Sequence, residues 1–415
     1  MNIKALRGKE EGHFFSKPVE NAIFIFVITA VALYLRYLLF PFKSGDFNTF
    51  LQPWTDTILE YGRFKAMGIR IGDYTPPYFY ILSLLTYLPF STLFSVKAVS
   101  CAADLVLAFY VMRIVNLRYK EEGYGLIAYA AVLLCPTVFL NSACWAQCDA
   151  IFTSALVACL YYVLKNEDYK ALLAFSISFV FKIQAIFFLP FIAVMILKKR
   201  IRWSALLMIP IVYMIAIFPA LLAGRPLMDL LTVYIAQAGQ YSRLALYCPN
   251  LYAWIPDNYA EYLSKPAVMF ALAVVLVSLA AIYRKRFKLT DNVIVTVAMF
   301  YSLLLPYVLP HMHERYFYLA DIMSIIFVFF FPRRFYVMLL TVGASLLSIC
   351  RYLFHTDFFS FQELAVAVTV NVLLVTIFLI KELKQAGTEL QLELLRERAE
   401  QIKENSQNTE LSVAE

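Results

Sequence analysis

The 415-residue chain is 62% hydrophobic and only 16% charged, whereas soluble domains carry roughly 25% charged residues. With a mean hydropathy of +0.70, this composition excludes an ordinary soluble enzyme and indicates an integral membrane protein. The net charge of +7 does not indicate a nucleic-acid binder, because the basic residues occur as short clusters between apolar runs, as membrane orientation requires.

The apolar runs are those of a polytopic helical bundle. Several approach the ~20 residues that a helix needs to cross a bilayer, including residues 21–40, 203–222, 267–283 and 364–380. The first run is too long and too late for a cleaved signal peptide. Together with the shorter runs, these segments predict an all-α transmembrane bundle of about 11 to 13 helices. The seven cysteines lack disulfide-rich or CxxC spacing and are predicted to be packing residues.

The basic clusters predict the orientation of the bundle. The positive-inside rule assigns them to the cytoplasm; they lie at residues 4–17, 113–120, 198–202, 284–288, 333–334 and 381–384. The intervening polar segments then share the extracytoplasmic side, and these are residues 41–78, 141–149, 224–265, 311–315 and 355–361. Both termini are predicted to be cytoplasmic, with a tail at 1–18, a membrane domain at 19–380 and a charged helical tail at 381–415.

This orientation allows only one crossing between the first loop and the basic cluster that begins at Arg113. Residues 97–117 are predicted to cross, whereas residues 79–96, which follow two prolines and contain a third, are predicted to form a juxtamembrane or re-entrant element. The juxtamembrane elements thus occupy residues 41–96. By the same parity, residues 171–197 are predicted to form two short helices that turn around Lys182 and Gln184, two candidate substrate-binding residues near the outer side.

The loop at residues 41–78 concentrates carboxylates on the predicted outer face. Asp46 follows the first apolar run, where a surface loop can hold its carboxylate within about 3 Å of a reacting hydroxyl, as a general base requires. Asp73, in GDYTPPY, is the second catalytic candidate. Asp56 and Glu60 have i,i+4 spacing on a predicted amphipathic helix and are assigned to its solvated face. The alternative for Asp46 is a solvated interfacial carboxylate.

Charged and amide side chains also occur at the ends of predicted spans. Arg36 lies about one turn inside the outer end of the first helix, and Lys97 begins the next predicted crossing helix. Burying a cation in a membrane is costly, so each of them is a functional-site hypothesis. Lys97 suits an anionic head group, with snorkelling to the interface as the alternative. Gln147 and Asp149, in ACWAQCDAIF, open a further helix. The amide suits a sugar hydroxyl, and the acid is either a ligand or a helix cap.

The segment LPHMHERYFYLAD places His311, His313, Glu314 and Arg315 between two apolar runs. Arg315 and a protonatable histidine are predicted to recognise a phosphate, with Glu314 orienting one of them. A structural ion-pair network is the alternative. The segment lacks HExxH spacing, so no metal site is predicted and a divalent cation is not favoured as a cofactor.

A second outer loop combines a cation, an amide and aromatic rings. In YSRLALYCPNLYAW, Arg243 and Asn250 are candidate substrate-binding residues, because aromatic rings beside amides are common in carbohydrate sites. The sequence has no GxGxxG or P-loop motif for a nucleotide. A phosphate-bearing substrate must therefore meet the membrane bundle itself, which favours a lipid-linked one.

Six segments resemble, in order, bacterial membrane proteins related to the GPI-anchor mannosyltransferases, which belong to the GT-C superfamily of polyprenyl-phosphate-sugar-dependent glycosyltransferases. They extend from about residue 36 to residue 321 and read SGDFNTFLQPW, GDYTPPYFYIL, WAQCDAIF, FKIQAIFFLP, PNLYAW and PHMHERYFYLAD. The resemblance implies that Asp46 is the catalytic base or orients the acceptor. By similarity, Lys97 holds the donor phosphate, although many relatives have Arg there. The first loop reads GDF instead of an acidic pair or DxD, a departure that bears on metal dependence.

The predicted function is a membrane glycosyltransferase that moves a hexose, such as mannose, glucose or galactose, from a polyprenyl-phosphate carrier to an envelope glycan or lipid. In a single inverting displacement, Asp46 takes the acceptor proton, while Lys97, Arg243 or Arg315 stabilises the departing phosphate. The main alternative is a polytopic transporter or a lipid or polysaccharide flippase, which would also bury charges among many helices. The sequence lacks the internal repeat that many transporters have. A polysaccharide polymerase or an acyltransferase is a third interpretation.

Overall fold

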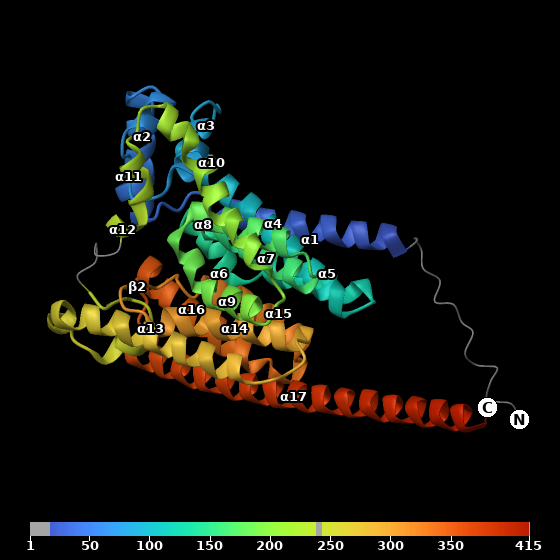
Figure 1. The fold of residues 1–415 in the computed structure, drawn as a ribbon. Coiled ribbons are helices and arrows are strands. Elements are labelled where there is room, and N and C mark those ends of the chain that lie inside the picture. Colours follow the sequence, from blue (N-terminus) through green and yellow to red (C-terminus); the bar gives the residue numbers. More distant parts are fainter. Residues whose placement is uncertain (1–16, 238–242, 415) are drawn as a thin grey trace, which may run out of the picture.

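Most of the chain is helical in a computed structural model that describes residues 17–237 and 243–414 (Figure 1). Among the described residues, seven helices are long and apolar enough to cross a membrane, and the bent pair Glu122–Leu133 and Pro136–Cys144 would make an eighth span. The predicted all-α polytopic bundle is therefore confirmed. The predicted number of helices is reached only when four shorter apolar helices, of 10–17 residues, are counted as well.

The loop after α1, which is predicted to be an outer loop, folds into short elements, as its prolines predict. After α1 (Lys17–Leu39) come η2 (Phe47–Leu51), α2 (Gln52–Glu60), η3 (Lys65–Gly68) and α3 (Pro76–Leu85). Helix α3 begins at a proline and has 10 residues, about 15 Å of helix, which is too short to cross a bilayer. Helix α4 (Thr92–Arg118) is a candidate span and begins where Ser91 accepts a hydrogen bond from the Phe94 amide at 3.3 Å.

The central helices supply most of the core. They are α5 (Glu122–Leu133), α6 (Pro136–Phe139), η4 (Leu140–Cys144), α7 (Asp149–Leu164), α8 (Asp168–Phe181), η5 (Ile183–Phe188) and α9 (Leu189–Leu197). The predicted break between two short helices is present, because α8 ends at Phe181 and Lys182 adopts an extended backbone with φ −153° and ψ 135°.

The second half of the described chain adds a second layer. Its elements are η6 (Trp203–Leu207), α10 (Met208–Leu222), α11 (Leu227–Leu231), α12 (Val233–Gln237), β1 (Ala245–Leu246), η7 (Leu251–Trp254), η8 (Asp257–Tyr259), α13 (Ala260–Arg284), α14 (Asp291–Val308), β2 (Met312–His313), α15 (Tyr318–Phe330), η9 (Pro332–Arg334), α16 (Tyr336–Phe354) and α17 (Phe361–Ala414). Helix α14 is the central helix of this layer, with every residue from Val293 to Val308 buried.

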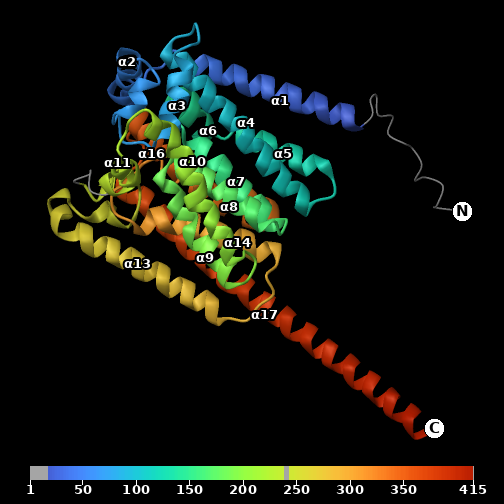
Figure 2. The ribbon, with the colours of Figure 1, turned by 45° about the horizontal axis from the view of Figure 1, so that its top comes forward.

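Two groups of helices flank the centre (Figure 2). On one side, α2, η3 and α3 pack with the end of α10 and with α11 around a small hydrophobic core of their own, which includes Leu51, Ile58, Phe79, Ile217 and Leu230. We call this group the α2–α3 unit. On the other side, α13, α14, α15, α16 and α17 form the second layer. The two short strands pair in parallel, Ala245 with Met312 and Leu246 with His313, and tie together two loops of this layer.

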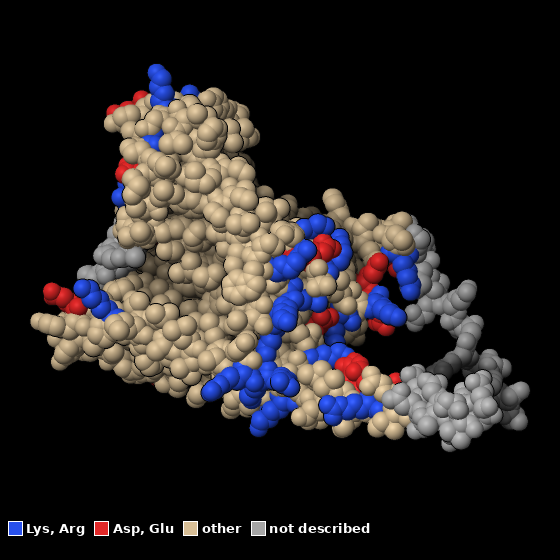
Figure 3. Space-filling view, in the orientation of Figure 1, with Lys and Arg blue, Asp and Glu red and all other residues tan. Residues whose placement is uncertain are grey.

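The loops rich in Lys and Arg meet at one end of the bundle, which we call the basic end. Figure 3 shows these side chains gathered beside the part of α17 that extends from the body. Lys198 donates to the Lys285 carbonyl at 2.7 Å, and Arg334 pairs with Glu382 of α17 at 2.9 Å. Helix α17 runs without interruption for 54 residues. The predicted C-terminal tail is thus helical and continues the last candidate span.

Candidate functional site

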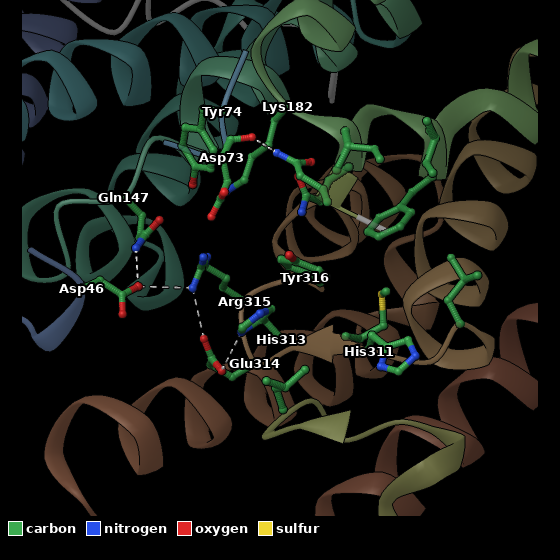
Figure 4. Close-up of a pocket in the computed structure, with 18 of the residues that line it drawn as sticks. Asp46, Asp73, Tyr74, Gln147, Lys182, His311, His313, Glu314, Arg315 and Tyr316 are labelled. Carbon is green, nitrogen blue, oxygen red and sulfur yellow. Dashed lines mark hydrogen bonds and ion pairs between the residues drawn. The ribbon is translucent and has the colours of Figure 1, made fainter. Parts of the chain in front are cut away.

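A cavity of about 970 Å³ lies in the bundle, and Figure 4 shows part of its wall. Figure 3 shows a hollow in the surface away from the gathered Lys and Arg side chains. The cavity wall is formed by residues far apart in sequence, which come from the η2–α2 segment, the loop before α3, the turn before α7, the α8–α9 break, α13, the loop before α15 and the end of α16. Residues from the predicted outer segments therefore meet at one place.

Asp46 is the most highly connected acid of this wall. Its Oδ2 accepts hydrogen bonds from Gln147 Nε2 at 2.7 Å, Trp145 Nε1 at 3.0 Å and an Arg315 amino group at 3.4 Å. Its Oδ1 accepts one from the Tyr352 hydroxyl at 2.7 Å. The Asp46 side chain remains 13% exposed. Because Oδ2 has three donors and Oδ1 has one, Oδ1 is the atom that retains room for a further hydrogen bond.

Two π-helical turns bring Asp46 and its donors together. Asp46 directly precedes η2, and Trp145 directly follows η4; both elements are π-helices, a form often found at functional sites. Ala146 has φ +65°, which is uncommon for a residue with a side chain. It lies between Trp145 and Gln147, two of the four residues that donate to Asp46. Ser44 Oγ also donates to the Trp145 carbonyl at 2.8 Å, which joins the two segments directly.

Arg315 connects the acids of the site. Beside its contact with Asp46, it lies 3.2 Å from Glu314 Oε1 and 3.7 Å from Asp149 Oδ2. Burial acts to lower the pKa of Arg315, but the carboxylates of Asp46, Asp149 and Glu314 outweigh it and hold the pKa well above its ordinary value. Arg315 therefore remains a cation, and its planar group is the shared partner of three carboxylates.

A second cation, Lys182, completes this cluster from the α8–α9 break. Lys182 Nζ donates to Asp149 Oδ1, whose other oxygen accepts from Asn141 Nδ2 at 2.8 Å. The ammonium also lies 5.5 Å from the centre of the Tyr74 ring, within the range of cation–π attraction. Three carboxylates thus face Lys182 and Arg315, so a bound phosphate needs additional positive charge. Lys265 of α13 and the two histidines line the same cavity.

The histidines are held by the short strand pairing. The His311 backbone has φ +62°, its amide donates to the Leu244 carbonyl at 2.7 Å, and its Nδ1 is 2.7 Å from the Arg243 carbonyl. His313 Nδ1 lies 3.8 Å from Glu314 Oε2. This backbone holds both imidazoles at the cavity wall.

Most predicted site residues line the cavity. They are Asp46, Asp73, Gln147, Lys182, Gln184, His311, His313, Glu314 and Arg315, and Asp149 lies behind them as the partner of both cations. Asp73 is at the edge, where its side chain is 35% exposed and pairs with Arg70 at 3.5 Å. Asp56 and Glu60 are exposed on α2, as predicted.

Arg36 and Lys97 lie outside the cavity wall. Arg36 Nε donates to Asp104 Oδ2 at 2.9 Å inside the bundle, and Ser142 Oγ donates to the same oxygen at 2.6 Å. Lys97 Nζ donates to the Leu39, Phe40 and Phe42 carbonyls at 3.1, 3.1 and 2.6 Å. Lys97 thereby caps the carbonyl end of α1, so its observed contacts are with backbone.

Arg243 and Asn250 also lie away from the cavity wall. The Arg243 side chain is 55% exposed and pairs with Asp257 at 3.2 Å. Asn250 is buried; its Nδ2 donates to the Leu309 carbonyl at 3.1 Å, and its Oδ1 accepts from the Tyr252 amide at 3.0 Å. Asn250 thus fastens the second loop to the end of α14, where its role is in holding the backbone.

Sequence reasoning did not select Tyr352, Trp145 or Lys265. The Tyr352 ring stacks on Trp145 with centroids 4.9 Å apart and an interplanar angle of 24°. Trp145 lies within the WAQCD segment that supplied two predicted site residues, so this segment could have identified its indole as a further site group. Tyr352 lies within an apolar run, where one tyrosine has no distinguishing pattern.

No protein-family model matches the chain, and no curated protein matches it either. Within residues 17–237 and 243–414, no three His, Cys, Asp or Glu side chains are grouped so that they could hold a metal ion.

Proposed function

We propose that this protein is a membrane glycosyltransferase that transfers a hexose, such as mannose, glucose or galactose, from a polyprenyl-phosphate carrier to an envelope glycan or lipid. One observation carries the proposal: a carboxylate with an open hydrogen-bonding position, Asp46, contacts a guanidinium, Arg315, at the wall of a cavity of about 970 Å³. An acid that accepts a proton and a cation that stabilises a leaving phosphate are the two groups that such a transfer requires.

The apolar part of the wall supports a lipid-linked donor. Ile186, Val268 and Met269 line the cavity, and they are also 36%, 48% and 71% exposed. Val268 and Met269 belong to α13, within a candidate span, so the cavity opens beside a surface that would face lipid. A polyprenyl chain can lie against these side chains while its phosphate reaches Arg315, Lys265 and the histidines.

The proposed reaction is a single displacement. An acceptor hydroxyl gives its proton to Asp46 Oδ1 as its oxygen forms a bond to the anomeric carbon. The bond between that carbon and the phosphate oxygen breaks, and its electron pair stays on the phosphate. Attack opposite the leaving group inverts the anomeric centre. Arg315 offsets the charge on the departing phosphate, with Lys265 and His311 as further cationic or hydrogen-bonding groups.

The distribution of charge supports a proposed orientation of the bundle in the membrane. The positive-inside rule places the basic end in the cytoplasm, which puts the cavity on the extracytoplasmic face and both termini in the cytoplasm. The alternative function is a transporter or a lipid or polysaccharide flippase. Its support is the Arg36–Asp104 pair in the interior of the bundle, because paired intramembrane charges also line transport pathways.

A direct assay separates the two functions. Purified protein is incubated with a panel of radiolabelled polyprenyl-phosphate sugars, and release or transfer of the sugar is measured. We expect turnover with one member of the panel and a loss of about 10²- to 10⁴-fold for Asp46→Asn, because proton transfer is removed. Asp56→Asn is the matched control, because Asp56 is in the same loop but exposed. Movement of lipid across vesicles without sugar release would contradict the proposal and favour the flippase.

A further inference from the structure

The loop that joins α10 to α11 contains a buried arginine outside the cavity wall. Arg225 is 3% exposed, and its Nε has no hydrogen-bond partner in the described part of the chain. Among the side chains that the structure describes, Arg225 forms no ion pair, and Asp229 acts on it only through its charge at a distance. An uncompensated buried charge is costly. Arg225 therefore needs an explanation that the protein's own acids do not supply.

The hydrogen-bond donors and charges around Arg225 favour binding of an anion. The Tyr80 hydroxyl accepts a hydrogen bond from the Ala220 amide at 3.0 Å, so its own proton is available for donation. Burial lowers the pKa of Arg225; Asp229 partly offsets this effect, and the positive charge of Arg70 adds to it. Two cations therefore lie near each other, with Asp229 exposed beside Arg225 and Asp73 paired with Arg70 at 3.5 Å. A bound anion would relieve the repulsion between the cations.

The surface around Arg225 is apolar. Leu222, Leu227 and Met228 are 66%, 40% and 68% exposed. Arg225 follows the end of a candidate span, Trp203–Leu222, by three residues. In Figure 1 the α10–α11 connection forms the tip of the α2–α3 unit, away from the second layer of helices. A cation just beyond a span, among exposed apolar side chains, lies where the phosphates of a bilayer begin and acyl chains are adjacent.

We infer that Arg225 and the Tyr80 hydroxyl bind the phosphate group of a membrane lipid at the tip of the α2–α3 unit, with Arg70 adding positive charge. The exposed leucine and methionine side chains contact the acyl chains of that lipid. The site is separate from the cavity and does not depend on the proposed reaction. Its consequence is mechanical, because the lipid anchors the unit whose first helix, α2, is joined to Asp46 through η2.

Lipid binding to purified protein in neutral detergent tests this site. The protein is titrated with phosphatidylglycerol, with diacylglycerol, which has the same chains without phosphate, and with inorganic phosphate. Bound lipid is counted by native mass spectrometry. We expect phosphatidylglycerol alone to bind, and Arg225→Gln to weaken it at least tenfold, as loss of charge-assisted hydrogen bonds predicts. Arg351→Gln is the matched control, because Arg351 is paired with Asp357 at 3.1 Å and should bind like the parent.

A second variant keeps the test informative if folding is affected. Arg225→Met removes the uncompensated charge, so its melting temperature without lipid should equal or exceed that of the parent, while phosphatidylglycerol no longer raises it. Equal phosphatidylglycerol affinity in the parent and in Arg225→Gln would overturn the inference. Equal binding of diacylglycerol would also overturn it. Saturation by inorganic phosphate at matched concentration would assign the site to a soluble anion and overturn the lipid assignment.

Discussion

Two of the buried charged centres in this bundle each join an acid to an arginine, and they differ in what surrounds them. Arg36 and Asp104 are 2% and 0% exposed, and the guanidinium also donates to the Ala32 and Leu133 carbonyls at 3.1 and 2.9 Å. Asp46 and Arg315 are 13% and 12% exposed and border the large cavity. Both centres join an acid to an arginine. Only the second leaves space for another molecule beside the charges.

Burial cost alone therefore does not identify a reactive site in a membrane protein. The Arg36–Asp104 pair joins α1 to α4, and Ser142 of η4 adds a third contact. The Arg36 Nε and Nη1 donors and the Asp104 Oδ2 acceptor are directed to other parts of the protein, which is a structural arrangement. Arg36 Nη2 and Asp104 Oδ1 are buried without a hydrogen-bond partner among the described residues. The Asp46 centre retains an oxygen with hydrogen-bonding capacity beside open space, which is the arrangement that a substrate needs.

The largest effect on stability is expected from breaking the Arg36–Asp104 pair. Arg36→Met leaves Asp104 as an uncompensated charge, and such a change costs about 3–5 kcal/mol of unfolding free energy. Thermal unfolding in detergent measures the loss. The double variant Arg36→Met/Asp104→Leu should recover much of it, and its turnover per folded molecule should equal that of the parent. A stable single variant that had lost turnover would reverse the assignment of the two centres.

A smaller effect is expected from substituting Lys97. The result distinguishes the observed role of Lys97 in capping α1 from its predicted role in phosphate binding. Lys97→Met removes hydrogen bonds to three carbonyls at the end of α1, and we expect a loss of about 1.5–3 kcal/mol in stability. The KM for the lipid donor should stay unchanged in the folded fraction. A raised KM with unchanged stability would instead support phosphate binding by Lys97.

The smallest effect is expected from Tyr352, whose hydroxyl contacts Asp46 Oδ1 at 2.7 Å. Tyr352→Phe keeps the stack on Trp145 and removes one hydrogen bond, worth about 0.5–1.5 kcal/mol. We expect kcat to fall by roughly 2- to 12-fold, with KM unchanged. Steady-state kinetics of the proposed transfer provide the measurement, and Tyr37→Phe, at an exposed tyrosine of α1, is the control. Equal kcat in Tyr352→Phe and parent would show that Asp46 does not depend on this contact.

Much of the fold was predictable because membrane helices are specified locally. A run of apolar residues has to satisfy its backbone within itself, so hydropathy identified the long spans. Prolines and parity also separated the short α3 from the crossing α4. Parity also predicted the break at Lys182. Boundaries were less accurate: α4 begins at Thr92, earlier than the predicted residue 97.

Composition and hydropathy were enough to identify an all-α membrane protein and to place Asp46, Gln147 and Arg315 in polar segments predicted to share one side of the membrane. Only the tertiary structure decided that these three side chains touch, that Tyr352 joins them, and that Arg36 and Lys97 are directed elsewhere. Hydropathy is a property of consecutive residues, so it can be read along the chain. The partner of a charged side chain depends on packing between segments up to 306 residues apart.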